Sequence, residues 1–271
     1  MKKTPKMLYK YVTPERVDVL ERLKIRFTQG SQLNDPYECT PIFSEAYPSD
    51  ALAKASRPPT GHGFIEFHPR PGVAPFDNIN PQEKAKVNHL IVELMRTILR
   101  DVILILSLSD KRDNLAMWAH YTSNHQGLVI GFDAHHRFFL RNNRASGGLD
   151  LAAANKVFYT RRRPQFKFVT EISKSAAFFT KSPEWQYEGE WRMLRNIEDE
   201  HEVIYNGIEP IYLFTVPPDA VRCVILGAAS SVKTQERIVS AVRGNAELSH
   251  VQLLKAENDK HSFKLLIKDL A

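Results

Sequence analysis

The sequence predicts an α+β fold with a mixed or antiparallel central sheet and flanking helices. Strand-like and helical segments are interleaved along the 271 residues without the regular βαβ rhythm of a doubly wound fold. Several strand-like segments follow one another directly, as at 210–216 and 220–228. Residues 81–101 form one long amphipathic pattern, which predicts a helix.

The first forty residues predict a strand, a helix, a strand and a turn. Residues 7–12 are rich in β-formers, and a Thr-Pro pair then opens a helical pattern over 13–23. Residues 24–28 alternate between apolar and polar side chains, which places Arg26 on the polar face of a second strand. The Asn-Asp-Pro triplet at 34–36 predicts a turn, because Asn and Asp side chains bond the nearby backbone and Pro fixes φ.

Residues 48–81 differ from the rest of the chain in composition. They hold seven of the sixteen prolines and show poor periodicity. We interpret them as an inserted loop or lid in a single domain that spans residues 1–271. The helix that follows presents an apolar stripe of Val87, Leu90, Ile91, Leu94, Ile98 and Leu99.

The remaining pattern continues the alternation of short strands and helices. Strands are expected at 102–109, 127–133, 156–160, 188–195, 210–216, 220–228, 250–256 and 262–269. Helices are expected at 115–124, 171–182 and 234–243. In the first of these helices, Leu115, Trp118 and Ala119 are expected to face the core.

Composition is typical of a soluble globular protein, with 43% hydrophobic and 25% charged residues. The net charge of +6 favours anionic small molecules or acidic partners. Cys39 and Cys223 lack metal-like or redox-like spacing, so a reducing cytoplasm is the expected location. The N-terminal lysines precede no apolar segment, which argues against a signal peptide. The longest apolar run, 102–106, is too short to cross a membrane.

Glu188 and Glu190 are the leading catalytic candidates. They flank a glycine at the start of a predicted strand, where residues i and i+2 share a face. Two carboxylates at this spacing repel each other and can stabilise a developing positive charge or handle a proton. The alternative is that Glu188, Glu190 and Arg192 neutralise one another on an exposed strand face, with Trp191 and Met193 packed behind them.

Further polar residues are candidates for binding a ligand. Arg26 could hold a phosphate or carboxylate bidentately, or it could be a solvated strand residue. Asn34, Asp35 and Glu38 could orient a polar ligand from the mouth of a loop, or the Asn-Asp-Pro triplet could only form the turn.

His120 and Tyr121 could bond ribose hydroxyls or stack on a heterocycle, and the alternative is an aromatic core helix. Ser107 and Ser109 share one face at the end of a buried strand, where they could donate to a ligand or cap the turn.

Other site classes receive less support from the sequence. The histidine spacings match no metal-ligand pattern, so no metal is expected. Walker A, G-x-G-x-x-G and G-x-S-x-G sequences are lacking. The basic and aromatic segment 161–168 could meet nucleic acid, but this partner ranks last because acidic residues near a phosphate track would repel it.

Separated pieces of the chain together resemble one family. They are LYKY at 8–11, LNDPYE at 33–38, SLSDKRDNLAMWAHYTSNHQGLVIGFD at 107–133 and KSPEWQYEGEWRML at 181–194. Together they resemble the bacterial family called domain of unknown function 2971. That family carries no settled activity.

The opening strand, helix and Arg-bearing strand are also similar, more distantly, to ADP-ribosyltransferase folds. This resemblance implies that NAD is a co-substrate, held by Arg26 and supported by Ser107 or Ser109. It implies that Glu190 is the catalytic carboxylate and that Glu188 orients the acceptor. Lys10 stands where some of those enzymes have His, and the SLS sequence only approximates their serine-bearing pattern.

Two function classes follow. The first is an NAD-dependent ADP-ribosyltransferase or NAD glycohydrolase, in a toxin or phage-defence setting. The second is a non-catalytic nucleotide-sensing or protein-interaction module that uses the same residues. Both imply a nucleotide or another anionic small molecule as ligand and no membrane partner, and both leave the oligomeric state open.

Overall fold

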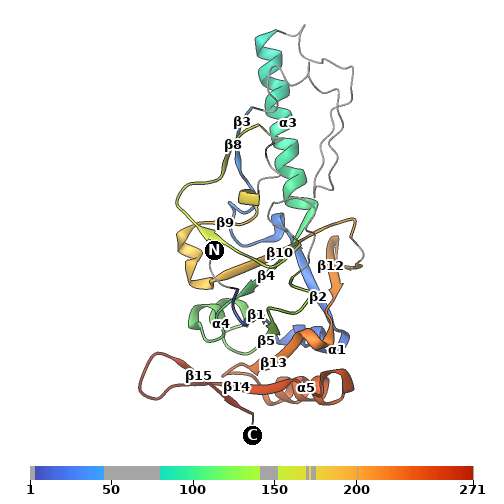
Figure 1. The fold of residues 1–271 in the computed structure, drawn as a ribbon, viewed down its shortest axis with the longest axis vertical. Helices are drawn as coiled ribbons and strands as arrows, with labels where there is room; N and C mark the ends of the chain where they lie inside the picture. Colours follow the sequence, from blue (N-terminus) through green and yellow to red (C-terminus); the bar gives the residue numbers. More distant parts are fainter. Residues whose placement is uncertain are drawn as a thin grey trace.

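The computed structural model describes residues 4–45, 80–140, 152–168, 171, 175–199 and 201–270 and has the predicted α+β fold. The predicted insertion at 48–81 lies outside the described residues except for its last two, which begin a helix. In the described part of the chain, eleven strands form one mixed sheet (Figure 1).

Nine strands follow one path through this sheet. Their order is β11 (Glu202–Asn206), β12 (Glu209–Thr215), β2 (Lys24–Gln29), β4 (Ile103–Ser109), β1 (Met7–Val12), β5 (Leu128–Asp133), β13 (Val221–Leu226), β14 (Gln252–Asn258) and β15 (Leu265–Asp269). Neighbours on this path are antiparallel except β13 and β14, which are parallel. The prediction of a mixed sheet is confirmed.

The sheet forks at β4. On one edge, β10 (Glu190–Asn196) pairs with β4 along its whole length and also pairs with β6 (Asn155–Lys156). On the other edge, β2 pairs only with Leu104 and Ile105, whereas β1 pairs only with Ser109. Among the described strands, none pairs with the intervening stretch of β4 on that edge. Strands β1 and β2 therefore diverge there and leave an opening between them.

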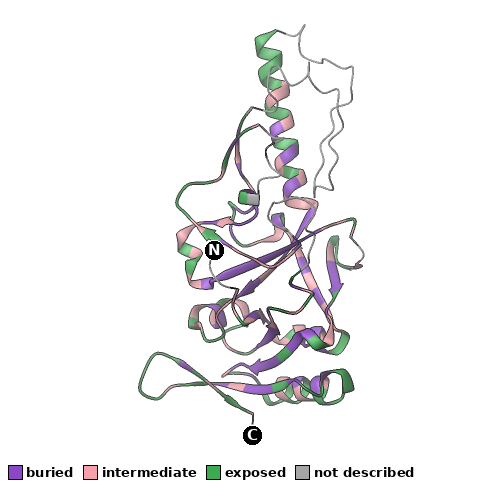
Figure 2. Ribbon diagram, in the orientation of Figure 1, coloured by how far each residue is buried: buried purple, intermediate pink, exposed green. Residues whose placement is uncertain are grey.

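Helix α3 (Pro81–Asp101) begins at the predicted residue. The Asn80 side chain accepts from the backbone N–H groups of Gln82 and Glu83, and Glu83 reaches back to the Asn80 N–H in a capping box. The expected stripe is only partly right, because the buried residues are Val92, Met95 and Leu99, whereas Leu90 and Leu94 are 68% and 53% exposed. The first turns of α3 stand away from the sheet, and Figure 2 shows them mainly exposed.

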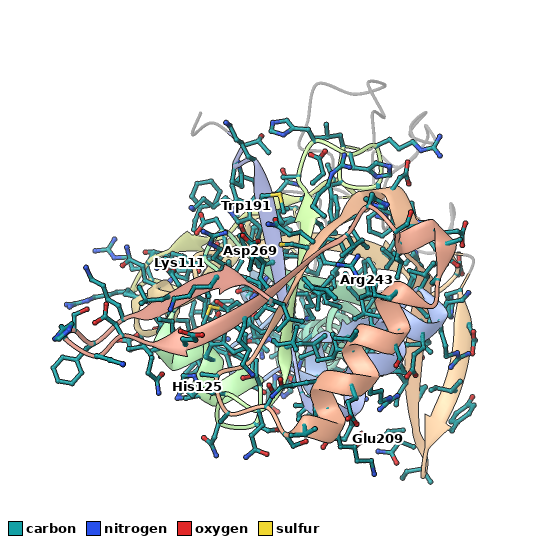
Figure 3. The ribbon with its side chains drawn as sticks, turned by 90° about the horizontal axis from the view of Figure 1, so that it is seen from below. Lys111, His125, Trp191, Glu209, Arg243 and Asp269 are labelled. Carbon is teal, nitrogen blue, oxygen red and sulfur yellow. The ribbon has the colours of Figure 1, made fainter. Side chains whose placement is uncertain are left out.

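The other helices cover the sheet at its lower end. Helix α1 (Asp18–Arg22) follows the 3-10 turn η1 (Pro14–Val17) and packs against α5 (Val232–Arg243). Figure 3 shows α5, with Arg243 at its end, on the same side of the molecule as the hairpin of β14 and β15. These elements close the largest apolar core.

Helix α4 (Leu115–Tyr121) packs against β1 and the 3-10 turn η5 (Pro183–Glu188). The Asn114 side chain caps it, as predicted, by accepting from the Met117 N–H. Trp118 is fully buried and meets the Tyr11 ring edge-on at 5.5 Å. The expected core face is wrong at Leu115, which is 39% exposed, because Met117 takes the buried place beside Trp118.

Two local predictions are wrong for reasons of tertiary structure. The strand expected at 156–160 is divided between β6 and β7 (Phe158–Tyr159), and β7 pairs with β9 (Thr180–Lys181). The helix expected at 171–182 is replaced, within its described residues, by the 3-10 turn η4 (Ser175–Ala177) and β9. Burial of the consecutive Phe178 and Phe179, followed by Lys181, overrides local helix propensity.

Three further strands of the described residues were missed by the sequence pattern. Strand β11 forms a hairpin with β12, and Gly207 in its turn has φ +65°. The Asn-Gly dipeptide there is a strong hairpin signal. Strand β8 (Gln165–Phe168) pairs in parallel with β3 (Ile42–Glu45), a contact across more than 120 residues that no local pattern indicates.

Candidate functional site

A cavity of about 250 Å³ lies at the fork of the sheet, lined by residues of β1, β2 and β4. The segment 32–38, helix α4 and residues 181–190 complete its wall. Six of the eight predicted site residues line this cavity: Arg26, Asn34, Ser107, Tyr121, Glu188 and Glu190. Sequence positions more than 160 residues apart thus meet in one hollow.

Asp35 and His120 do not line the cavity. The buried Asp35 carboxylate accepts from the Tyr37 N–H at 2.9 Å, and the Asp35 carbonyl accepts from the Glu38 N–H at 3.0 Å. Asp35 therefore forms the turn, which was the alternative interpretation. The exposed His120 packs beside the rings of Tyr121 and Tyr187, at centroid distances of 6.4 and 6.2 Å.

A left-handed glycine brings the two carboxylates together. Glu188 ends η5, Gly189 has φ +54°, and Glu190 begins β10. The prediction that both carboxylates lie on one strand is wrong, because the chain turns between them. The Ser109 hydroxyl holds this turn by donating to the Glu188 carbonyl at 2.5 Å, and the Asp110 N–H donates to the Gly189 carbonyl at 3.2 Å.

Replacing Gly189 with alanine is expected to destabilise the protein strongly. A residue with a Cβ pays about 1–2 kcal/mol in the left-handed region. The new Cβ would also lie 2.3 Å from Asp110 Oδ1. Lys156 and the Trp191 indole hold that carboxylate at 2.5 and 3.2 Å, so it is not free to move away.

The matched control for this variant is Gly207→Ala. Gly207 also has positive φ, but no atom lies within 4 Å of a Cβ built there. In urea unfolding, Gly189→Ala should lose about 1–3 kcal/mol more than Gly207→Ala, as expected for overpacking. Equal losses would mean that Asp110 does not constrain the turn.

Four residues that line the cavity, Glu38, Lys181, Glu188 and Glu190, form a buried network of five charged side chains with Arg192 behind them. Lys181 Nζ lies 2.7 Å from Glu188, 3.2 Å from Glu190 and 3.4 Å from Glu38. Arg192, with no exposed surface, donates to both oxygens of Glu38 at 2.6 and 2.8 Å and to both oxygens of Glu190 at 2.8 and 2.9 Å. The alternative interpretation of the sequence placed Arg192 with the two carboxylates on an exposed strand face, and that placement is wrong because all three side chains are buried.

The two catalytic candidates differ in their remaining capacity to accept hydrogen bonds. A carboxylate has about four lone-pair sites. Glu190 accepts three bonds, two from Arg192 and one from Lys181. Glu188 accepts one from Lys181 and one from the Tyr121 hydroxyl. Glu188 therefore has more capacity left for a ligand.

The environments of these carboxylates also shift their pKa values in opposite directions. Burial raises the pKa of Glu188, and the neighbouring Lys181 only partly offsets this effect. Burial acts on Glu190 in the same sense, but Arg192 and Lys181 together outweigh it and lower the pKa of Glu190 to about 2. Glu190 thus stays ionised, and Glu188 is the carboxylate suited to exchange a proton.

Two cations lie among the residues that line the other wall. Arg26 donates from Nη2 to the Gln32 side chain at 2.5 Å, and its buried Nε has no hydrogen-bond partner among the described residues. Lys10 Nζ donates to the Ser107 carbonyl at 3.0 Å, on the stretch of β4 without a strand partner on this side. Burial lowers the pKa of Lys10 to about 8, although Glu190 partly opposes this shift.

The Lys10 pKa predicts a pH dependence of stability. In the unfolded chain Lys10 keeps its ordinary pKa of 10.5, so between pH 8 and 10.5 the unfolded state binds more protons than the folded state. Stability should therefore rise with pH across this window relative to Lys10→Met. Urea unfolding of both proteins from pH 7 to 10 measures the difference, and a constant difference would contradict burial of the charged amine.

Sequence reasoning missed several lining residues. Lys181 begins the KSPEWQYEGEWRML segment but was not singled out there, and β9, the strand that carries it, pairs with β7. Glu38 was named with Asn34 and Asp35 as a residue that could orient a ligand, and it lines the cavity with Asn34. Lys10 was noted only as a departure from a related pattern.

The described residues bear on three other kinds of site: a metal site, a nucleic-acid surface and a membrane span. In that part of the chain, no group of three or more His, Cys, Asp or Glu side chains is placed to hold a metal ion. Phe166, one of the two phenylalanines in the segment 161–168, is 7% exposed and packs on Phe43, so its ring is not available to stack on a base. Of the helices in the described ranges, none is long and apolar enough to span a membrane.

Comparisons with known proteins relate part of the chain to a family. No curated protein and no solved structure matches it. Residues 117–193 match the model of a family described as a protein of unknown function, DUF2971. The matched segment runs from α4 to β10 and includes Tyr121, Lys181, Glu188, Glu190 and Arg192. Over these residues the chain is similar to the DUF2971 family.

Proposed function

We propose that the protein binds NAD and cleaves its nicotinamide–ribose bond, passing the ADP-ribosyl group to an acceptor or to water. The observation that carries this proposal is a pair of carboxylates with opposed pKa shifts in the same cavity as two cations. The resemblance of the first strands to ADP-ribosyltransferase folds also implies NAD as the substrate.

The size of the cavity limits what enters it. Pockets that enclose a whole drug-sized ligand occupy about 300–1,000 Å³. At about 250 Å³, this cavity holds the nicotinamide and its ribose but not the whole dinucleotide. The exposed Asn34 lies at the cavity mouth, and Arg26 supplies a guanidinium for the diphosphate.

In the proposed reaction the carboxylates act at different stages. Breaking the C–N bond leaves its electron pair on nicotinamide and positive charge on the ribosyl carbon. Glu190, held ionised by Arg192 and Lys181, stabilises that charge without reorganisation. The oxygen of the acceptor hydroxyl or of water then bonds to the ribosyl carbon, and Glu188 accepts the proton that this oxygen loses.

A second function is favoured by one observation. The hydrogen-bonding capacity of Glu190 is mostly filled by protein groups, since Arg192 and Lys181 already occupy three of its acceptor sites. A non-catalytic nucleotide sensor would need only the binding wall of Arg26 and Lys10. It would show stabilisation by NAD or ADP-ribose without turnover.

Nicotinamide release from NAD, followed by chromatography, tests the proposed function. We expect release by the native chain, and release lowered about tenfold or more in Arg26→Gln through loss of a charge-assisted contact. The matched control is Arg222→Gln, which removes an exposed guanidinium of β13 that pairs with Asp133 of β5. Thermal stabilisation by NAD without nicotinamide release would favour the sensor. The absence of both stabilisation and release would refute both functions.

A further inference from the structure

A second cavity, of about 400 Å³, shares a wall segment with the first. Residues 31–40 contribute Ser31, Pro36, Tyr37 and Thr40 to it, whereas Gln32, Leu33, Asn34 and Glu38 line the first cavity. The end of α3 and Arg163 supply the rest of its lining. The proposed function uses none of these residues.

Three guanidinium groups line this second cavity. Arg96 and Arg100 lie four residues apart on one face of α3, and Arg163 comes from a distant part of the chain. Arg163 donates to Thr40 Oγ1 at 3.0 Å and lies over the Tyr37 ring at 5.4 Å. These contacts hold the third guanidinium at the rim of the cavity.

Two of these groups hold donors that the described residues do not satisfy. The Nε atoms of Arg96 and Arg100 are buried, and among the described residues neither has a hydrogen-bond partner. Buried polar atoms are nearly always paired, so each such atom calls for an explanation. Glu93 pairs with Arg96 through another nitrogen, and Asp101 is the second lining carboxylate. The lining therefore keeps one more cation than anions.

We propose that this second cavity binds a phosphate group of an anionic small molecule. Guanidinium forks match phosphate oxygens bidentately, and the hydroxyl of Ser31 in the same lining adds a further donor. The end of α3 presents the negative pole of its helix dipole here, which opposes an anion. A partial charge spread over carbonyls is weaker than the net positive charge that the three guanidinium groups keep over Glu93 and Asp101, so the balance favours phosphate.

Calorimetric titration of the full chain with inorganic pyrophosphate tests this site. The native protein is expected to bind it, and Arg96→Gln combined with Arg100→Gln should weaken binding about tenfold or more. The matched control is Arg222→Gln combined with Arg237→Gln, two exposed arginines that each pair with one carboxylate elsewhere. This control should bind like the native protein.

A milder variant keeps the test valid if the double variant does not fold. Arg163→Gln changes an exposed side chain and should weaken pyrophosphate binding severalfold. No heat of binding up to about 10 mM, or native affinity in the Arg96 and Arg100 variant, would overturn the proposal.

The first cavity provides the second control. Because Arg26 is proposed to contact a diphosphate, Arg26→Gln should remove only pyrophosphate binding in the first cavity and leave binding in the second cavity intact. Loss of all binding in Arg26→Gln, together with native binding in the Arg96 and Arg100 variant, would place the probe in the first cavity and overturn the proposal. Failure of NAD cleavage would not affect this result, so the two proposals can fail separately.

Discussion

Replacing Arg192 with methionine is expected to lower the free energy of unfolding by about 3–5 kcal/mol. Arg192 is fully buried between Glu38 and Glu190, and it donates to both carboxylates. Methionine fills much of the same volume but leaves two buried carboxylates with only Lys181 as a cationic partner. The loss of the counter-charge, more than the loss of packing, sets the size of the effect.

Equilibrium urea unfolding measures this change. The matched control is Arg222→Met, which removes an exposed arginine paired with Asp133 and should cost only about 0–1 kcal/mol. A loss below about 1 kcal/mol in Arg192→Met would contradict the account, since it would mean that water or protonation compensates Glu38 and Glu190 without the guanidinium.

The second large effect separates Glu188 from Glu190. Glu188→Gln is expected to lower the rate of nicotinamide release about 100-fold or more, with little change in stability. The raised pKa of Glu188 means that burial disfavours its charged form, so a neutral amide of the same shape is tolerated. The measurements are single-turnover release and urea unfolding of the same samples.

Glu190→Gln should instead lose both activity and stability, because Arg192 and Lys181 keep buried charges without their partner. The pKa of about 2 also predicts that the stabilising contribution of Glu190 is complete above its ordinary pKa of 4.5 and is lost as pH falls toward 2. If Glu188→Gln kept native activity, Glu188 would have no part in proton transfer.

Much of the fold follows from local patterns. Five elements were predicted close to their observed bounds: strands β1, β2, β4 and β5 and helix α3. The strands are short apolar or alternating segments, and the helix is a capped amphipathic segment. The errors concentrate around residues 156–188, where paired two-residue strands and 3-10 turns replace regular elements. There long-range burial outweighs propensity, so no window of sequence carries the information.

The site was predictable only in part. Arg26 and Glu190 reach one cavity because β2 and β10 occupy opposite edges of β4, which is a property of sheet order and not of spacing. Lys181 and Arg192 turn the acidic pair into a buried ion network, and a strand pattern alone suggested an exposed face for Arg192. Charge balance in a core depends on partners that lie far away in sequence.

A crystal structure of Glu188→Gln with NAD would show where the dinucleotide binds. We expect nicotinamide and its ribose in the cavity at the fork, the ribose between residues 188 and 190, and the diphosphate within hydrogen-bond reach of the Arg26 guanidinium. NAD bound elsewhere with this cavity filled only by water would contradict this expectation, and so would NAD bound in reverse with its adenine at Glu190.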